Sequence, residues 1–192
     1  MTSVKKITIT AIGIALFVAL TLCLQVPIFE NYYICLGYLV MAVYCCSVGV
    51  TSGTIVGTFG VILYCLIISG LRGMPGWVLG NIVIGIISGL AFKYTRKMEN
   101  KIMKYIICIF AILFSTFLGI LICKSGLESI IYSQPFIVRT ASNIYAFVAD
   151  VVVLILSIPF CEILDKRIKT FIKWGNYEEI RFEARYANSD NS

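Results

Sequence analysis

Residues 7–29 read ITITAIGIALFVALTLCLQVPIF, and this stretch contains no charged side chain. A helix needs about 20 mostly apolar residues to cross the hydrocarbon core of a bilayer, so the stretch is long enough to span a membrane. Lys5 and Lys6 precede it, as basic residues precede a secretory signal, but no small-residue cleavage site interrupts it and comparable runs follow. We therefore expect a retained first membrane span.

The composition of the whole chain has the same bias. Of its 192 residues, 59% are hydrophobic and 14% are charged, whereas soluble domains are about half apolar and about a quarter charged. Long continuous apolar runs are typical of helices, because the strands of a membrane barrel alternate in polarity. The sequence thus predicts an all-α integral membrane protein, a bundle of six transmembrane helices. The six runs cover roughly residues 7–27, 34–50, 53–71, 77–94, 104–123 and 136–164.

The chain shows no convincing internal repeat, so we expect one transmembrane domain over residues 1–165. Residues 166–192 are predicted to form a basic interfacial stretch followed by a polar cytoplasmic tail. Apolar residues among the basic ones are typical of an anchor at the membrane interface, and the alternative is a docking site for a cytoplasmic partner. These apolar residues are Ile168, Phe171, Ile172 and Trp174.

The distribution of basic residues predicts the orientation in the membrane, because cytoplasmic flanks carry an excess of lysine and arginine. If both termini are cytoplasmic, only Arg72, Lys124 and Arg139 of the 16 basic residues lie on the outer side. We therefore expect cytoplasmic N and C termini. The net charge of +6 then reflects topology and attraction to anionic lipid headgroups, and it does not indicate nucleic-acid binding.

Several kinds of catalytic and metal site are excluded by residue type. The chain has no histidine, which removes Ser-His-Asp and Cys-His catalysis and HExxH zinc sites. Its eight cysteines lie in or beside the apolar runs without a CxxC pair, so we expect small hydrophobic residues and no metal site. The glycines of GLRGMPGWVLGN, residues 70–81, lack the following lysine of a phosphate-binding P-loop.

The same stretch, residues 70–81, suggests a different role. It connects the third and fourth runs on the predicted outer side, so Arg72 would lie at the outer mouth of the bundle, and Trp77 and Asn81 are one helical turn apart on the fourth span. We predict that this stretch forms part of a binding-site mouth. The alternative is a plain turn with an interfacial tryptophan and a solvated arginine.

The sixth span supports the binding-site interpretation. Asn143 lies about 40° and Asp150 about 20° around the helix from Arg139, so all three share one face. Ionisable groups within a span usually face the bundle interior or a wet cavity. The predicted substrate-binding residues are Arg139, Asn143, Asn81, Trp77, Arg72 and Tyr33. Asp150 is deeper and is either part of this site or an interhelical hydrogen-bonding group.

Two outer loops are expected to cover the opening of this site. The first is FENYY, residues 29–33, which contributes Glu30, Tyr32 and Tyr33. The second follows the fifth run and contributes Glu128.

A stripe of small residues marks the first span. Ala11, Ala15 and Ala19 repeat as AxxxAxxxA on one face within TAIGIALFVAL, residues 10–20. Small residues at this spacing let another helix approach closely. The partner helix belongs either to a separate subunit or to the same bundle.

Together, these motifs resemble a known family. The six spans, the AxxxA motif, GVTSGTIVGTFG at residues 49–60 and PGWVLGNIVIGIISGL at residues 75–90 resemble a substrate-binding S component of the energy-coupling factor (ECF) vitamin transporters. The likeness covers roughly residues 5–170. It implies capture of a water-soluble vitamin or related micronutrient from outside, in a pocket closed by the first outer loop.

The resemblance also implies partners. Ala11, Ala15 and Ala19 would dock onto a transmembrane T subunit that carries two ATPase subunits, and ATP and magnesium would be used there, leaving this chain without a cofactor or a catalytic residue. The expected location is a bacterial cytoplasmic membrane.

The residues leave the substrate open among riboflavin, a folate-like pterin, pantothenate and a form of vitamin B6, since arginines, asparagines and aromatic rings suit any flat or anionic polar molecule. The rival interpretations are a stand-alone small-solute permease and, with less support, a membrane-embedded enzyme.

Overall fold

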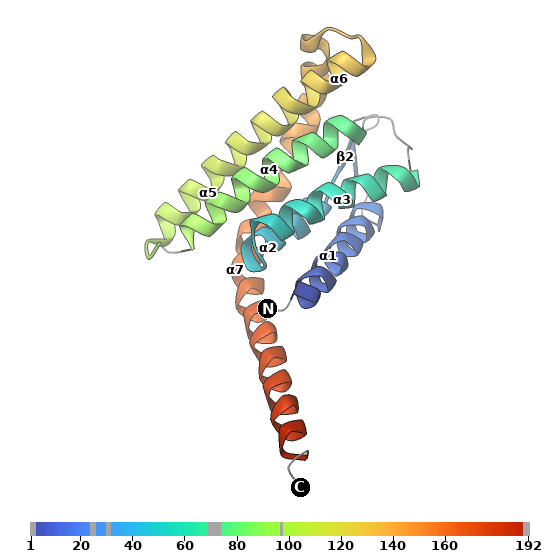
Figure 1. The fold of residues 1–192 in the computed structure, drawn as a ribbon. Coiled ribbons are helices and arrows are strands. Elements are labelled where there is room, and N and C mark those ends of the chain that lie inside the picture. Colours follow the sequence, from blue (N-terminus) through green and yellow to red (C-terminus); the bar gives the residue numbers. More distant parts are fainter. Residues whose placement is uncertain (1–2, 24–25, 30–31, 69–73, 97, 190–192) are drawn as a thin grey trace.

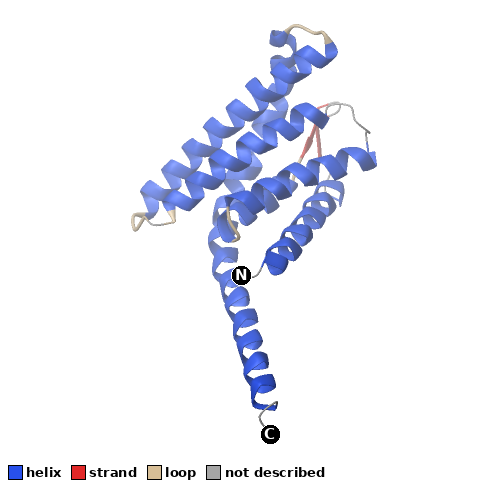
Figure 2. Cartoon of the chain, viewed as in Figure 1, coloured by secondary structure: helices blue, strands red, loops and turns tan. Residues whose placement is uncertain are grey.

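The computed structural model describes residues 3–23, 26–29, 32–68, 74–96 and 98–189. It is a helical bundle with one short β-hairpin (Figures 1 and 2). The elements are α1 (Ser3–Cys23), β1 (Val26–Phe29), β2 (Tyr32–Ile34), α2 (Gly37–Ser47), α3 (Val50–Ile68), α4 (Met74–Thr95), α5 (Lys101–Thr116), the π-helix η1 (Phe117–Lys124), α6 (Ser125–Tyr132) and α7 (Phe136–Ser189).

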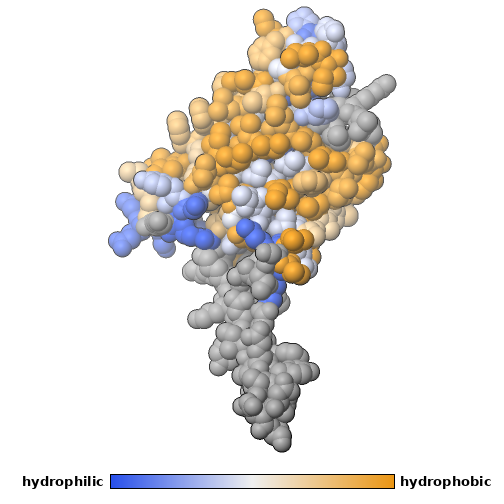
Figure 3. All heavy atoms as spheres, in the orientation of Figure 1, coloured by the Kyte–Doolittle hydropathy of each residue, from blue (hydrophilic) through white to orange (hydrophobic). Residues whose placement is uncertain are grey.

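Most of the predicted spans are present. Within the described residues, five helical stretches are long and apolar enough to cross a membrane: Val4–Cys23, Val50–Ile68, Pro75–Thr95, Lys101–Tyr132 and Phe136–Leu164. Apolar side chains on them face outward, as Ile67 (63% exposed) and Phe110 (70% exposed) illustrate, and Figure 3 shows an apolar band across the face of the bundle in view. A surface of this kind is suited to lipid. The cytoplasmic location of the termini stays a prediction.

The second run folds differently from the prediction. Instead of a span over residues 34–50, the helix α2 covers 11 residues, Gly37–Ser47, a length of about 16 Å that is too short for a hydrocarbon core of about 30 Å. The helix starts late because residues 32–34 pair in a β-hairpin. It ends just before Gly49, which has a φ of 135°, a backbone conformation that glycine adopts readily. α2 is instead buried within the bundle, packed on α1, α3, α4 and α7.

The hairpin is an exception to the predicted all-α fold. β1 and β2 are antiparallel, with Val26 opposite Ile34 and Pro27 opposite Tyr33. β2 also packs against α7. We call the end of the bundle that carries the hairpin, the start of α4 and the start of α7 the hairpin end. The turn between α4 and α5 lies at the opposite end (Figure 1).

The fifth span is longer than predicted. The helix does not stop at residue 123 but continues through η1 and α6 to Tyr132, and Ser133 ends it with a left-handed φ of 52°. The expectation that Glu128 lies in an outer loop is therefore wrong, because this residue is helical and buried. α7 then runs as one helix of 54 residues, with Pro159 inside it, and the predicted boundary at residue 165 falls within this helix.

Close backbone contacts fix α4 against the fifth span. A Cβ atom built on Gly80 would lie 2.9 Å from the carbonyl oxygen of Gly119, and one built on Gly119 would lie 2.8 Å from the carbonyl oxygen of Gly80. Neither contact leaves room for a side chain. This contact brings α4 and η1 together one residue before Asn81.

Candidate binding site at the hairpin end

The polar residues predicted for the site lie on two helices that start at the hairpin end. Trp77 and Asn81 belong to α4, and Arg139, Asn143 and Asp150 belong to α7. Arg72 lies outside the described residues. For Tyr33 the structure describes the backbone alone, which pairs with Pro27.

A tyrosine from α2 connects the α4 residues. Trp77 Nε1 donates a hydrogen bond of 2.9 Å to the Tyr38 hydroxyl, which donates one of 2.7 Å to Asn81 Oδ1. Asn81 Nδ2 then donates to the carbonyl oxygen of Gly57 on α3 at 3.0 Å. Tyr38 and Asn81 are both fully buried. Groups from three helices thus form one continuous chain of hydrogen bonds, which we call the Tyr38 network.

Aromatic rings surround this network. The rings of Tyr64 and Trp77 meet edge to face with centroids 5.7 Å apart, and those of Phe17 and Tyr38 are 6.5 Å apart at an interplanar angle of 66°. Rings in this arrangement offer flat apolar surfaces beside polar hydrogen-bonding groups. Phe17, Tyr64 and Trp77 thus enclose the network in an aromatic environment.

Asn143 takes part in a second cluster rather than in the Tyr38 network. Its Nδ2 donates to the Ser125 hydroxyl and to Glu128 Oε2, at 3.0 Å each. The three residues are 2%, 0% and 6% exposed. We call Ser125, Glu128 and Asn143 the Asn143 cluster, and it joins α6 to α7.

The two clusters are neighbours because α4 begins beside α6. A Cβ atom built on Gly76 would lie 3.1 Å from Glu128 Cγ and 3.1 Å from the carbonyl oxygen of Lys124. Gly76 immediately precedes Trp77 in the sequence. The polar residues of α4 and α7 thus lie near each other because both helices contact α6. Asn81 and Asn143 do not contact each other directly.

Asp150 adds a carboxyl group to the Tyr38 network. It is 3% exposed and lies next to the Tyr38 hydroxyl. Of the two roles predicted for Asp150, the contact with Tyr38 fits both, since this contact is interhelical and belongs to the candidate site. Asp150 and Glu128 are thus the two buried carboxyl residues of the candidate site.

Arg139 lies apart from the other predicted residues. Its guanidinium carbon is 4.4 Å from the centroid of the Tyr132 ring, a cation–π contact at the end of α6. Its Nε atom is buried and has no hydrogen-bond acceptor within the described part of the chain. Arg139 is placed at the rim, one helical turn from the Asn143 cluster.

Besides Asp150, whose role was left open, three side chains of the two clusters were absent from the predicted substrate-binding set. Tyr38 lies in the run ICLGYLVMAVY, where a tyrosine counts as apolar, and nothing local shows that its hydroxyl meets Asn81. Ser125 was missed, and Glu128 was assigned to a covering loop, because the span was predicted to end at residue 123. Their spacing of three residues, which places both on one helical face, was the available signal.

An apolar pocket lies beside these clusters. It measures about 400 Å³ and is lined by Ile34 of β2 and by five residues of α7 between Ile144 and Val152. Ile144, Val148 and Val152 are about half exposed, so this pocket opens on the outer face of the bundle. The hairpin therefore leaves space between itself and α7.

The alanine stripe of α1 faces outward. Ala11, Ala15 and Ala19 are all exposed, whereas Gly13 is buried against Tyr44 and Val56.

Among the described residues, no group of three or more histidine, cysteine, aspartate or glutamate residues could hold a metal ion.

Comparison with known proteins assigns the family. The family model described as "ECF-type riboflavin transporter, S component" matches residues 1–166. No curated protein and no solved structure matches the chain. The matched region holds α1 to α6 and the part of α7 that carries Asn143 and Asp150, and the family is a transporter component and not an enzyme. The chain therefore belongs to the S components of ECF-type riboflavin transporters, a family of substrate-binding membrane subunits.

Proposed function

We propose that this protein captures riboflavin at the hairpin end and delivers it across a bacterial cytoplasmic membrane. The observation that carries the proposal is the Tyr38 network, where buried polar groups from α2, α3 and α4 meet inside a bundle whose core is largely apolar. Polar groups are costly inside a membrane protein and usually mark a substrate path. The family description names riboflavin.

The chemistry of the two clusters suits a flavin. The isoalloxazine ring is flat and aromatic, and its pyrimidine edge carries carbonyl acceptors and an imide N–H donor. Asn81 and Asn143 each offer an amide with both a donor and an acceptor, and Trp77 and Tyr64 offer ring faces. Glu128 and Asp150 can accept hydrogen bonds from the hydroxyls of the ribityl chain.

Substrate binding is expected to exchange hydrogen bonds rather than create all of them anew. Trp77, Tyr38 and Asn81 already satisfy one another. A ligand that replaces these bonds with equivalent ones gains affinity, whereas one that leaves a buried amide unpaired loses it. This requirement favours a molecule with several matched donors and acceptors over a simple apolar ring.

Transport itself is assigned to a larger assembly. We propose that the exposed alanines of α1 dock on a transmembrane T subunit, and that two ATPase subunits on it hydrolyse ATP with magnesium. Small side chains on an outward-facing stripe support this proposal because they permit close contact with another helix. The chain itself would then need no cofactor.

The test is a binding titration of the full-length protein in detergent. Riboflavin, pantothenate, pyridoxine and folate are each added, and bound ligand is quantified by equilibrium dialysis. Preferential saturable binding of riboflavin at one site per chain is the expected result. Preferential binding of another vitamin would overturn the assignment of the substrate while leaving the family role intact, and binding of none of them would overturn the proposed site.

A further inference from the structure

The Asn143 cluster leaves hydrogen-bonding capacity unused. The side-chain nitrogen of Asn143 carries two N–H groups, and it donates to the Ser125 hydroxyl and to Glu128 Oε2. Both donors of this buried amide are therefore engaged. Within the part of the chain that the structure describes, no donor reaches Asn143 Oδ1, so its carbonyl oxygen is an unused acceptor.

The π-helix η1 fixes the direction of one of these bonds. A serine hydroxyl has a single proton, and that of Ser125 is donated to the carbonyl oxygen of Ile120, five residues back, at 3.1 Å. Serine in an α-helix bonds to the carbonyl three or four residues back, so this bond depends on the wider π-helical turn. Toward Asn143, the Ser125 oxygen can only accept.

Glu128 fixes the same orientation of the amide from a second side. A carboxylate has acceptors and no donor, so a reversed amide would set Asn143 Oδ1 against a negatively charged oxygen. Asn143 engages Oε2 of this carboxylate, but among the described residues no donor reaches Oε1. The cluster therefore has unused acceptors, Asn143 Oδ1 and Glu128 Oε1, and its own side-chain donors are all spent.

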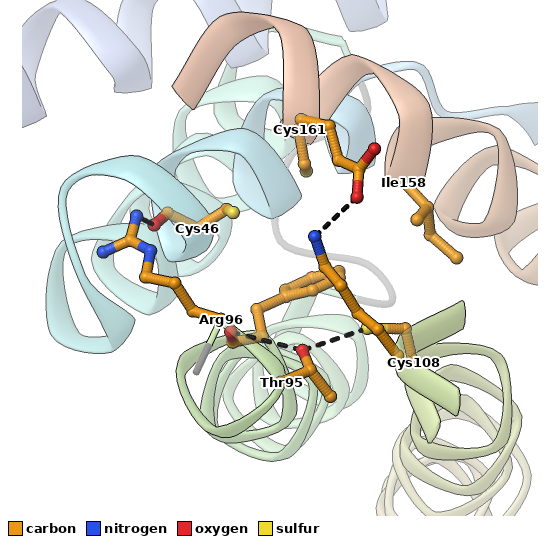
Figure 4. Close-up of a pocket in the computed structure, with 9 residues that line it drawn as sticks. Cys46, Thr95, Arg96, Cys108, Ile158 and Cys161 are labelled. Carbon is orange, nitrogen blue, oxygen red and sulfur yellow. Dashed lines mark hydrogen bonds and ion pairs between the residues drawn. The ribbon is translucent and has the colours of Figure 1, made fainter. Parts of the chain in front are cut away.

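A second carboxylate in the bundle shows full pairing. In the polar pocket at the end opposite the hairpin end (Figure 4), Lys104 Nζ lies 2.5 Å from Glu162 Oε1, and the Tyr105 hydroxyl donates to Glu162 Oε2 at 2.9 Å. Glu162 is 34% exposed and both of its oxygens have a partner, whereas Glu128 is 6% exposed and one of its oxygens has none within the described chain. A buried acceptor without a donor costs free energy, so the unused acceptors indicate a place for a ligand that donates.

A surface that only accepts hydrogen bonds distinguishes between the two parts of riboflavin. The ribityl chain carries hydroxyls, each with a proton to donate. The pyrimidine edge of the ring carries carbonyl oxygens on both sides of its N–H, and these would meet Asn143 Oδ1 or Glu128 Oε1 as acceptors facing acceptors. The Asn143 cluster therefore suits the ribityl chain and disfavours the ring edge.

The ring has a place next to this cluster. Trp77, whose indole N–H donates into the Tyr38 network, directly follows Gly76, and a Cβ atom built on Gly76 would lie 3.1 Å from Glu128 Cγ. The network and the Asn143 cluster are thus adjacent, so one ligand can reach both.

We propose that the Asn143 cluster is the subsite for the ribityl chain, where Asn143 Oδ1 and Glu128 Oε1 accept hydrogen bonds from its hydroxyls. Ser125 is a positioning residue, because it holds the Asn143 amide in the orientation that presents the oxygen. The ring of the substrate lies at the Tyr38 network. This inference rests on the proposed function, since it assigns the two parts of riboflavin within the proposed site.

The experiment compares riboflavin with lumiflavin, which has the same ring and a methyl group in place of the ribityl chain. Both are titrated by equilibrium dialysis against the full-length protein in detergent. Lumiflavin should bind at least about tenfold more weakly, because it leaves both acceptors unpaired. Equal affinities would overturn the subsite while leaving riboflavin binding intact, and binding of neither ligand would overturn the proposed function together with the subsite.

Two variants test the residues of the subsite. Ser125→Ala removes one anchor of the Asn143 amide and frees an N–H, and Glu128→Gln replaces the carboxylate by a neutral amide. Each should weaken riboflavin binding about fivefold and leave lumiflavin affinity unchanged, which also shows that the variant is folded. Equal losses for the two ligands in a variant with an unchanged melting temperature would overturn the assignment. If neither variant folds, the comparison of the two ligands on the unaltered protein decides.

Two controls accompany these variants. Ser157→Ala removes another buried serine hydroxyl, which donates to the carbonyl oxygen of Leu154 about 21 Å farther along α7 than Asn143, and it should change neither affinity. Tyr38→Phe acts at the ring and should weaken the binding of both ligands to a similar degree. A loss confined to riboflavin in Tyr38→Phe would show that the ribityl chain lies at the network, and the assignment would be wrong.

Discussion

The Tyr38 hydroxyl on α2 donates a hydrogen bond of 2.7 Å to the Asn81 side-chain oxygen on α4. The two residues are 43 positions apart in the sequence and both are fully buried. Because α2 is surrounded by other helices, this bond lies at the centre of the bundle and not at a lipid-facing surface. The substrate-binding proposal depends on it most directly.

Removing this hydroxyl should weaken both the fold and substrate binding. Tyr38→Phe leaves Trp77 Nε1 and Asn81 Oδ1 without their shared partner, and an unsatisfied buried polar group costs about 1–3 kcal/mol. We expect a lower melting temperature and lower riboflavin affinity, measured by thermal unfolding and by titration. Tyr94→Phe is the control, since Tyr94 is 71% exposed and should be neutral. Equal effects of the two changes would contradict the importance of the network.

Two substitutions in the Asn143 cluster should partly compensate for each other in their effect on riboflavin affinity. Asn143→Asp replaces a donor, 3.0 Å from Glu128 Oε2, with a second carboxylate, and like charges at this separation repel. We expect at least a tenfold loss of riboflavin affinity at neutral pH. Adding Glu128→Gln restores a donor–acceptor pair with the roles reversed, so affinity should recover in part. No recovery in the double variant would mean that Asn143 acts on the substrate without Glu128.

The contact between α4 and η1 should tolerate no added methyl group. Gly119→Ala places a Cβ atom 2.8 Å from the carbonyl oxygen of Gly80, so one helix must shift, at a cost of about 1–3 kcal/mol for overpacking. Thermal unfolding should show this loss. Gly126→Ala, whose nearest contact would be Phe136 at 4.0 Å, is the control and should be neutral or slightly stabilising. A neutral Gly119→Ala would indicate that the helices are not held at this distance.

Two substitutions on α1 should separate docking from folding. Ala15 is exposed, so Ala15→Leu should leave riboflavin binding by the isolated protein unchanged and reduce uptake into cells that express the complete transporter. Gly13 is buried, and a Cβ atom there would lie 2.6 Å from Tyr44 Cζ, so Gly13→Leu should reduce both binding and uptake. If Ala15→Leu also abolishes binding, the stripe supports the fold of the bundle instead.

The fold followed from the sequence where long apolar runs determined it. The runs at 53–71, 77–94 and 136–164 correspond to α3, α4 and the first part of α7, because backbone in lipid must form helices. The fifth span was predicted to end at Cys123, which is too early, because a charged residue such as Lys124 suggests the end of a span. The π-helix continues through Lys124 into α6, where Glu128 pairs with Asn143 of α7. Hydropathy does not encode such pairing between helices.

The candidate site was partly predictable for a similar reason. Asn81, Trp77 and Asn143 stand out as polar or amphipathic residues in apolar segments, and helical spacing places them correctly near one end. The side chains to which they hydrogen-bond depend on the relative axial positions and rotations of α2, α4 and α6. Tyr38 therefore pairs with Asn81, and Glu128 with Asn143, through packing that a single sequence does not reveal.

α7 is one continuous helix, so a small tilt of the bundle would move its far end over a large distance. Asn143 and Asp150 lie near one end of this helix and Glu162 farther along, and the helix then extends a further 27 residues to Ser189. This extension is about 40 Å long, so a tilt of about 30° would carry its tip through about 20 Å. A spin label or fluorophore near Ser189 would therefore report reorientation of the whole bundle with high sensitivity, without a probe in either pocket.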